Sequence, residues 1–174
     1  MKWGIVGERK MFYLCNCESL DCRMQQFLGN IEAKLDVKGR VFVPAAYRRA
    51  LEKEGDGALY LRLDTVTKCV KLYPSSEWNK LNEEFVSHIN MWNKDDLRLY
   101  RQFTAGVEMV ELDASGRILL QKKHIDAIQA STDVLFVGVG NYFEIWNKAN
   151  FEADLYGDAD FSDALQSKMG NVSI

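Results

Sequence analysis

The sequence LDVKGRV at residues 35–41 returns 77 positions later as LDASGRI at residues 112–118. Both copies place Asp-x-x-Gly-Arg between apolar residues. At ordinary amino-acid usage, one Asp-x-x-Gly-Arg is expected by chance in very roughly 3% of chains of this length. Two copies in matching apolar surroundings therefore indicate an internal duplication, which decides the architecture before any local prediction does.

A second pair of matching segments lies downstream of the first. VKLY at residues 70–73, followed by Trp78, returns as FEIW at residues 143–146, followed by Phe151, with an offset of 73. The order of the segments is the same in both copies, and the first copy has four more residues between them. We therefore expect two small half-units of about 50 residues each.

The bulk composition is that of a chain with a sizeable core. It has 174 residues, of which 47% are apolar, and a net charge of −3. No window of 18 apolar residues could span a membrane, and residues 1–17 lack the uninterrupted apolar run of a secretory signal. We therefore expect a cytoplasmic protein without membrane association.

Charge is divided unevenly between the two copies. Residues 31–53 carry six basic and three acidic side chains, a net charge of +3. The matching residues 108–128 carry three basic and four acidic side chains, a net charge of −1. A polyanion would prefer the first copy. The C-terminal residues 153–174 form an acidic tail.

The cysteines indicate reduced thiols rather than a metal site. Three of the four lie within residues 15–22, and the fourth is Cys69. No second Cys or His pair at workable spacing completes a metal site. Residues 1–23 have no counterpart in the second copy. We predict that residues 1–26 are an N-terminal extension, either misannotated or disordered. One hypothesis is that Met24 is the natural start, which would leave residues 1–23 as a misread upstream segment.

The two copies predict the same order of elements: strand, turn, strand, helix, strand, strand. Asp at the first position and Gly at the last position of each turn favour a type I turn. In the first copy these elements are predicted at residues 30–35, 36–39, 40–43, 45–53, 59–63 and 69–73. In the second copy the turn is predicted at residues 113–116, the helix around residues 125–128, and the last strands at residues 134–139 and 142–146.

An amphipathic helix is predicted between the copies, after Pro74, with Ser75 or Ser76 as its cap. Its apolar positions, at steps of three and four, are Trp78, Leu81, Phe85, Ile89 and Trp92. A second helix is predicted to carry Leu97, Tyr100 and Phe103. We interpret these aromatic residues as core packing between helix and sheet rather than as a ligand site. The predicted units are an extension (1–26), a first repeat (27–78), a helical connector (79–103), a second repeat (104–152) and a tail (153–174).

The predicted fold class is α+β, mainly β. Each half-unit is too small to be stable alone, so we expect each to complete the core of the other across a pseudo-two-fold axis. This resembles the swapped-hairpin fold of the SpoVT/AbrB family of DNA-binding proteins. The double copy, FLG at residues 27–29, both Asp-x-x-x-Arg motifs and FEIW at residues 143–146 resemble the MraZ family over about residues 27–155.

The resemblance implies a transcriptional regulator. Members of the family bind repeated elements in the promoter of the division and cell-wall gene cluster and assemble into rings. The expectation for this chain is a nucleoid-associated homo-oligomer, with double-stranded DNA upstream of its own gene as its partner. No cofactor, metal or small-molecule ligand is expected.

The family's motifs fall on Asp36 and Arg40, and on Asp113 and Arg117, with Gly39 and Gly116 inside the turns. Each Asp–Arg pair is either a structural clip, in which Asp accepts turn amides and binds its Arg, or part of a DNA contact. We expect Arg40 to contact DNA, because Lys34 and Lys38 flank it. Acidic neighbours surround Arg117, so we expect a clip or a subunit contact there.

Two further arginines, Arg48 and Arg49, lie on the predicted short helix and are secondary candidates for DNA contact. The alternative is a solvated helix face. The second copy departs from the family pattern after its second strand, where Gln121 takes the place of Pro44. This departure leaves the docking of the second helix open.

Catalysis is not expected from this sequence. His88 and His124 lie in separate predicted helices without a Ser or Cys motif, so structural roles are expected for both. Gly138 and Gly140 belong to a predicted turn rather than to a dinucleotide site. Two alternative functions remain: an antitoxin-like module that grips a protein partner with the acidic tail, and a purely structural ring.

Overall fold

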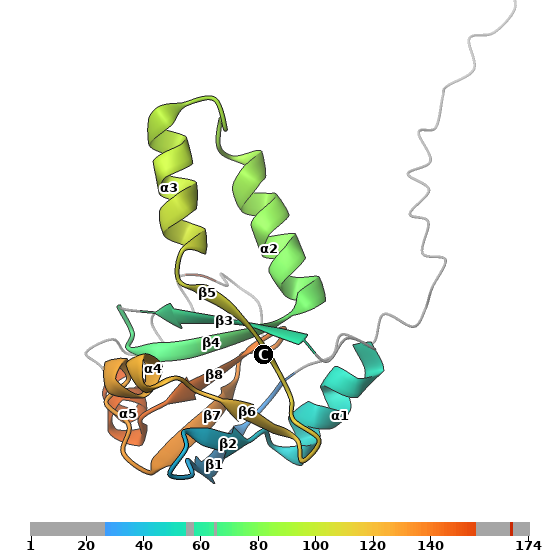
Figure 1. Ribbon diagram of the computed structural model, residues 1–174, viewed down its shortest axis with the longest axis vertical. Coiled ribbons are helices and arrows are strands. Elements are labelled where there is room, and N and C mark those ends of the chain that lie inside the picture. The colour runs from blue at the N-terminus through green and yellow to red at the C-terminus, as the bar shows by residue number, and fades with distance from the viewer. Residues whose placement is uncertain (1–26, 55–57, 65, 156–167, 169–174) are drawn as a thin grey trace, which may run out of the picture.

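Strands from both copies form one antiparallel sheet, and a two-stranded ribbon lies beside it (Figure 1). The computed structural model describes residues 27–54, 58–64, 66–155 and 168; the N-terminal extension, its cysteines and most of the acidic tail lie outside them. The strands are β1 (Asn30–Lys34), β2 (Arg40–Phe42), β3 (Ala58–Asp64), β4 (Cys69–Pro74), β5 (Val107–Glu111), β6 (Arg117–Leu119), β7 (Asp133–Gly138) and β8 (Phe143–Trp146). The helices are α1 (Ala45–Glu54), α2 (Ser75–Ser87), α3 (Lys94–Thr104), α4 (Lys122–Ala127) and α5 (Lys148–Leu155).

The two copies exchange their first strands. The sheet order is β1-β7-β8-β4-β3-β5, so β1 of the first copy pairs with the second copy, and β5 of the second copy pairs with the first. The second strands, β2 and β6, pair with each other in the separate ribbon. Reversing the order exchanges the two copies, which is the pseudo-two-fold symmetry that the repeat predicts. The swapped-hairpin α+β fold is therefore confirmed.

The exchange extends to the turns and the short helices. The Leu120 amide donates to the Gly39 carbonyl at 2.9 Å, and the Val43 amide donates to the Gly116 carbonyl at 3.1 Å. Residues 43 and 120 are equivalent under the offset of 77, and each directly precedes the position that differs between the copies, Pro44 or Gln121. The second helix therefore docks as the first does, despite the missing proline.

The core lies under one face of the sheet and is shared by both copies. Tyr47 of α1 contacts the rings of Phe27, Phe136 and Phe143, and its hydroxyl donates to the Gly29 carbonyl at 2.8 Å. The equivalent position in the second copy is His124, which is also buried. The burial of His124 agrees with the structural role expected for it. His88, in contrast, is exposed and follows the end of α2 rather than lying within it.

The opposite face of the sheet carries a charged pair at its centre. Lys71 on β4 lies opposite Glu144 on β8, with 3.9 Å between Nζ and Oε1, and Lys71 also binds Asp64 at 2.8 Å. Burial raises the pKa of Glu144. Cys69 lies on the same face, and burial raises the pKa of its thiol to about 12, which keeps it protonated and unreactive.

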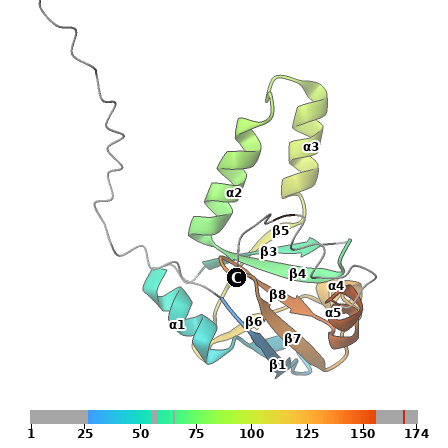
Figure 2. The same ribbon diagram turned by 180° about the vertical axis from the view of Figure 1, so that it is seen from behind.

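The two connecting helices stand side by side and project away from the sheet (Figure 1; Figure 2). The prediction of one helix extending to Trp92 was wrong: α2 ends at Ser87, and Trp92 is 98% exposed. Asn93, which lies between the two helices, caps α3 because its side chain accepts hydrogen bonds from the amides of Asp95 and Asp96. The predicted serine cap was also wrong, because Pro74 occupies the cap position and makes no side-chain hydrogen bond.

Packing between helix and sheet is confirmed only at the base of this hairpin. Trp78 is buried, and its ring stacks on Tyr60 of β3 at 5.6 Å and on Phe103 of α3 at 5.5 Å. Farther out, Phe85 stacks on Phe103 at 4.3 Å, which joins helix to helix rather than helix to sheet. None of the helices in the described residues is long and apolar enough to cross a membrane.

Replacing Gly39 by alanine tests the contact between turn and opposite copy. Gly39 has φ of 79°, and an added Cβ would lie 2.6 Å from the Leu120 carbonyl oxygen. Gly29 also has positive φ, at 85°, but an added Cβ would meet no heavy atom within 4 Å in the described structure, so Gly29→Ala isolates the backbone strain. We expect Gly29→Ala to lower the free energy of unfolding by about 1 kcal/mol and Gly39→Ala by about 2–4 kcal/mol in urea unfolding. Equal losses would show that the contact with Leu120 adds nothing.

Candidate nucleic-acid interface

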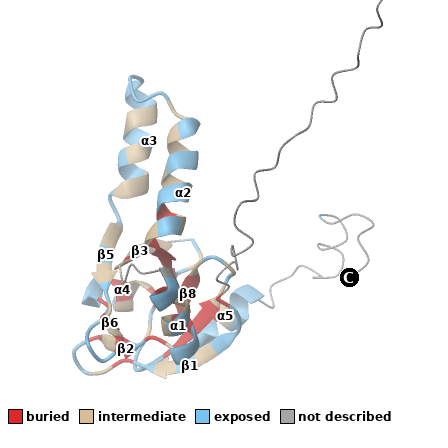
Figure 3. Ribbon diagram, turned by 90° about the vertical axis from the view of Figure 1, so that its right-hand side faces the viewer, coloured by how far each residue is buried: buried red, intermediate tan, exposed pale blue. Residues whose placement is uncertain are grey.

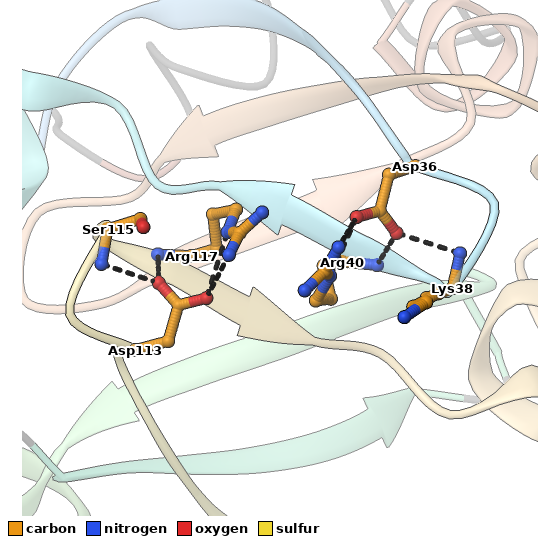
Figure 4. A network of polar contacts seen from close by, with 6 residues as sticks. All are labelled: Asp36, Lys38, Arg40, Asp113, Ser115 and Arg117. Carbon is orange, nitrogen blue, oxygen red and sulfur yellow. Dashed lines mark hydrogen bonds and ion pairs between the residues drawn. The ribbon is translucent and has the colours of Figure 1, made fainter.

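Both Asp-x-x-x-Arg motifs form the same closed clip (Figure 4). Asp36 accepts the amides of Lys38 and Arg40 at 2.8 and 2.9 Å, and the Arg40 guanidinium binds its other oxygen through Nε at 2.7 Å and Nη2 at 2.6 Å. Asp113 repeats every one of these contacts with Ser115 and Arg117. The motif thus fixes the turn and the Arg side chain together in both copies.

The clips also fix the charge of the two aspartates. The amide and the guanidinium of Arg40 lower the pKa of Asp36 to about 2, with a further contribution from the Lys38 amide. The corresponding groups of Arg117 and Ser115 lower the pKa of Asp113. Both aspartates are therefore ionised at neutral pH, and each balances the charge of its arginine. The net positive charge at the first turn comes from its lysines.

The two arginines lie on the same outward face of the β2–β6 ribbon. The register places Arg40 opposite Leu119 and Phe42 opposite Arg117, so the two arginines are diagonal neighbours. The Arg117 guanidinium lies 5.5 Å from the centre of the Phe42 ring. Phe42 and Leu119 are 57% and 53% exposed, whereas the alternate residues of the ribbon point into the core. The outward face therefore combines two guanidinium groups with two exposed apolar side chains.

Lysines near the first turn are exposed and only weakly paired. Lys38 makes no side-chain ion pair within the described residues, and Lys34 lies 3.8 Å from Asp133 with both side chains more than 70% exposed. Such an exposed pair contributes little and is screened by salt. The equivalent positions of the second copy are Glu111 and Ser115. Part of the difference in charge between the copies thus lies at and beside the two turns, and part lies on the short helices, where Arg48 and Arg49 correspond to Ile125 and Asp126.

Arg48 does not lie at the turn of its own copy. Its guanidinium packs on the second turn, where a Cβ at Gly116 would lie 2.5 Å from Arg48 Nη1. The equivalent residue, Ile125 of α4, packs on Gly39 in the same way. Arg48 Nε is buried and has no hydrogen-bond partner in the described structure. The exchange therefore separates Arg48 from Lys38, although an open groove beside β1 is lined by both Lys34 and Arg48.

The five predicted cations are thus distributed over three places. Lys34, Lys38 and Arg40 gather at the first turn, Arg48 supports the second turn, and Arg49 is exposed on α1. Sequence reasoning missed Phe42 and Leu119. The alternation of strand residues between the two faces could have identified them. Each lies two residues after the motif arginine, on the side opposite to the buried Val41 or Ile118. Among the described residues, no three His, Cys, Asp or Glu side chains group as metal ligands.

Comparison with known proteins agrees with the duplication. A family model described as "MraZ protein, putative antitoxin-like" matches residues 26–102 and again residues 103–169. A Bacteroides fragilis protein named Transcriptional regulator MraZ is 40% identical over 146 residues, which cover 84% of this chain and 92% of that protein. Proteins of the same name from Phocaeicola vulgatus and Coxiella burnetii (strain Dugway 5J108-111) are 39% and 32% identical, covering 86% and 72% of this chain and 99% and 82% of their own. The chain belongs to the MraZ family.

Proposed function

We propose that this chain is a sequence-specific DNA-binding transcriptional regulator without enzymatic activity. Its target is double-stranded DNA upstream of its own gene, in repeated promoter elements of the division and cell-wall gene cluster. It acts in the cytoplasm, associated with the nucleoid. The observation that carries the proposal is a hydrogen-bonded turn with exposed Lys38, next to exposed Lys34 at the end of β1, beside a ribbon face with two arginines.

The geometry of the ribbon suits a DNA groove. The major groove of B-DNA admits a two-stranded β-ribbon. The outward arginines of β2 and β6 supply donors for phosphate or guanine edges, and Phe42 supplies an apolar contact of the kind that recognises thymine methyl groups. Because each clip holds its arginine in place, little side-chain freedom is lost on binding. Lys34 and Lys38 add charge that steers and anchors the phosphate backbone.

Assembly supplies the affinity that one such surface lacks. A few cations per subunit bind DNA weakly at physiological salt. A homo-oligomeric ring that engages several repeated elements at once raises the effective concentration of each remaining contact. The regulator that we propose is therefore a ring, and its DNA binding depends on assembly more than on any single contact.

The alternative is an antitoxin-like module that binds a protein partner. The description of the matching family includes the word antitoxin-like. Fluorescence anisotropy with upstream DNA and with a scrambled duplex, across a salt series, separates the two proposals. Tight and salt-dependent preference for the upstream DNA supports the regulator. Equal weak binding to both duplexes contradicts it and favours the search for a protein partner.

Lys38→Ser should weaken binding to the upstream DNA. It copies into the first turn the residue found in the second, so the turn is expected to keep its fold. The slope of log K against log salt should flatten by about one unit for one lost phosphate contact. Ser115→Ala is the matched control at the equivalent exposed position and should leave the slope unchanged. A Lys38→Ser protein with the parent's slope would exclude Lys38 from the interface.

Arg48→Ile should separate the binding role of Arg48 from its packing role. Ile125 already packs on the glycine of the other turn, so isoleucine at position 48 should pack on Gly116 and leave stability unchanged or higher. If the guanidinium contacts phosphate, affinity falls and the salt slope flattens by about one unit. If both quantities stay at the parent's values in a folded protein, Arg48 only supports the second turn.

The clip at the first turn predicts an acid-sensitive contribution to stability. Since the folded pKa of Asp36 lies at about 2, below its ordinary value of 3.8, the contribution is present above pH 4 and is lost as the pH falls towards 2. NMR titration of the Asp36 carboxyl should show this pKa. In Arg40→Met the pKa should rise but stay below 3.8, because the amides of residues 38 and 40 still donate. A pKa near 3.8 in the parent would contradict the clip.

A further inference from the structure

One edge of the sheet, at β1, is not covered by another strand of the described structure. β1 lies at the end of the sheet order, and none of its five residues is buried, whereas four of the six residues of its neighbour β7 are buried (Figure 3). The Leu35 amide donates to the Thr132 carbonyl at 2.8 Å, on the β7 side. Because backbone groups alternate between the two sides of an antiparallel strand, those of Asn30 and Glu32 point away from β7.

A groove runs along this free edge, because β2 turns away from β1. Leu35, directly after β1, bridges Val41 of β2, and β2 then pairs with β6 instead. The groove that opens between them has a volume of about 580 Å³. Its lining is mostly apolar, with Ile31 and Ala33 on the side of β1 and Phe42, Pro44 and Ala45 on the other.

In the second copy, polar side chains close the equivalent place. Glu108 on β5 accepts a hydrogen bond from Gln121 at 2.9 Å and binds the ammonium group of Lys123, so the strand and the start of α4 are joined. The equivalent residues of the first copy cannot form these bridges: they are Ile31, Pro44 and Ala46. The open groove is therefore a difference between the copies and not a consequence of the shared fold.

The groove carries positive charge that the described residues do not compensate. Its two acids already hold cations, because Glu32 binds Lys148 at 2.7 Å and Asp36 is part of the clip. Arg48 lines the groove and makes no ion pair in the described part of the chain, and its Nε is buried there without a hydrogen-bond partner. Lys34 has the weak, exposed contact described above. A carboxylate entering the groove meets both of these cations.

We propose that this groove binds an extended peptide of a protein partner, in which apolar and acidic residues alternate. The peptide adds to β1 as a further strand, through the outward backbone groups of Asn30 and Glu32. The side chains on one face of the added strand enter the apolar groove, and the acidic side chains on its other face lie beside Lys34. Arg48 adds an attractive charge within the groove. This interaction goes beyond DNA binding and does not depend on it.

Fluorescence polarisation with the full-length chain and a short labelled peptide of alternating valine and glutamate tests this surface. The peptide should bind at submillimolar concentration, and a peptide with lysine in place of glutamate should bind about tenfold more weakly. N-methylation of the peptide amides that face β1 should abolish binding, since it removes the backbone donors. In NMR spectra the amides of Asn30 and Glu32 should shift, whereas those of Val107 and Met109, the equivalent residues of β5, should not.

Variants that copy the second copy into the first provide the matched comparison. Lys34→Glu introduces the residue found at Glu111 and should weaken binding of the glutamate peptide about tenfold. Glu111→Lys, at the same place on β5, is the control and should leave binding unchanged. Ile31→Glu/Pro44→Gln/Ala46→Lys builds the closing side chains into the first copy and should abolish binding. Circular dichroism checks that this variant is folded, and the exposed Lys34→Glu position serves as the test if it is not.

Three results overturn the inference: a glutamate peptide that does not bind, equal affinity for the glutamate and lysine peptides, or amide shifts that appear on β5 in place of β1. Upstream DNA is the competing occupant. If DNA shifts the amides of Asn30 and Glu32 while the peptide does not bind, the groove belongs to DNA and the peptide proposal is wrong. A parent that binds the peptide but ignores its upstream DNA contradicts the regulator and leaves the peptide surface standing.

Discussion

The exchange of strands between the two copies is the constraint on which the rest of the structure depends. Neither half of the sheet is complete without the outer strand of the other, and neither turn is supported without the other copy's backbone. The amides of Val43 and Leu120 hold the turn glycines across the copies. These turns need glycine for two reasons: the backbone has positive φ, and at Gly39 the Leu120 carbonyl leaves no room for a Cβ. Folding and formation of the candidate DNA surface are therefore one event.

The same exchange decides what the candidate surface contains. It brings the two motif arginines, 77 residues apart in the chain, onto one face of a two-stranded ribbon. It also places Arg48 of the first copy on the turn of the second copy, and Ile125 of the second copy on the turn of the first. The surface proposed for DNA thus belongs to both copies, although the exposed lysines belong to one. At the equivalent positions of the second copy, Glu111 and Ser115 take the places of Lys34 and Lys38.

Holding both copies in one chain lets equivalent positions differ. Lys71 and Glu144 are equivalent under the offset of 73, and they face each other on the two central strands. In a dimer of identical half-units this place would bring like charges together on a half-buried face, which is unfavourable. The buried pair Tyr47 and His124 shows the same divergence, with a hydroxyl bonded to the backbone in one copy and an imidazole in the other. Equivalent positions of the two copies therefore carry different residues where the copies pack against each other or in the core.

The sequence by itself determined the duplication, the order of elements in each copy up to its last strand, and the turn type, because these follow from local periodicity and from glycine and aspartate in turns. Half-units too small to fold alone predicted a shared core, and the resemblance to a known family predicted the swapped-hairpin α+β fold; helix α5 was not predicted. The sequence also predicted the motif residues and the charge difference between the copies. The tertiary structure alone decided where α2 ends, which left Trp92 exposed, since apolar spacing does not reveal whether a partner surface exists. It alone placed Arg48 on Gly116 and exposed Phe42 beside Arg117, because contacts between the copies depend on the register of paired strands and not on distance along the chain.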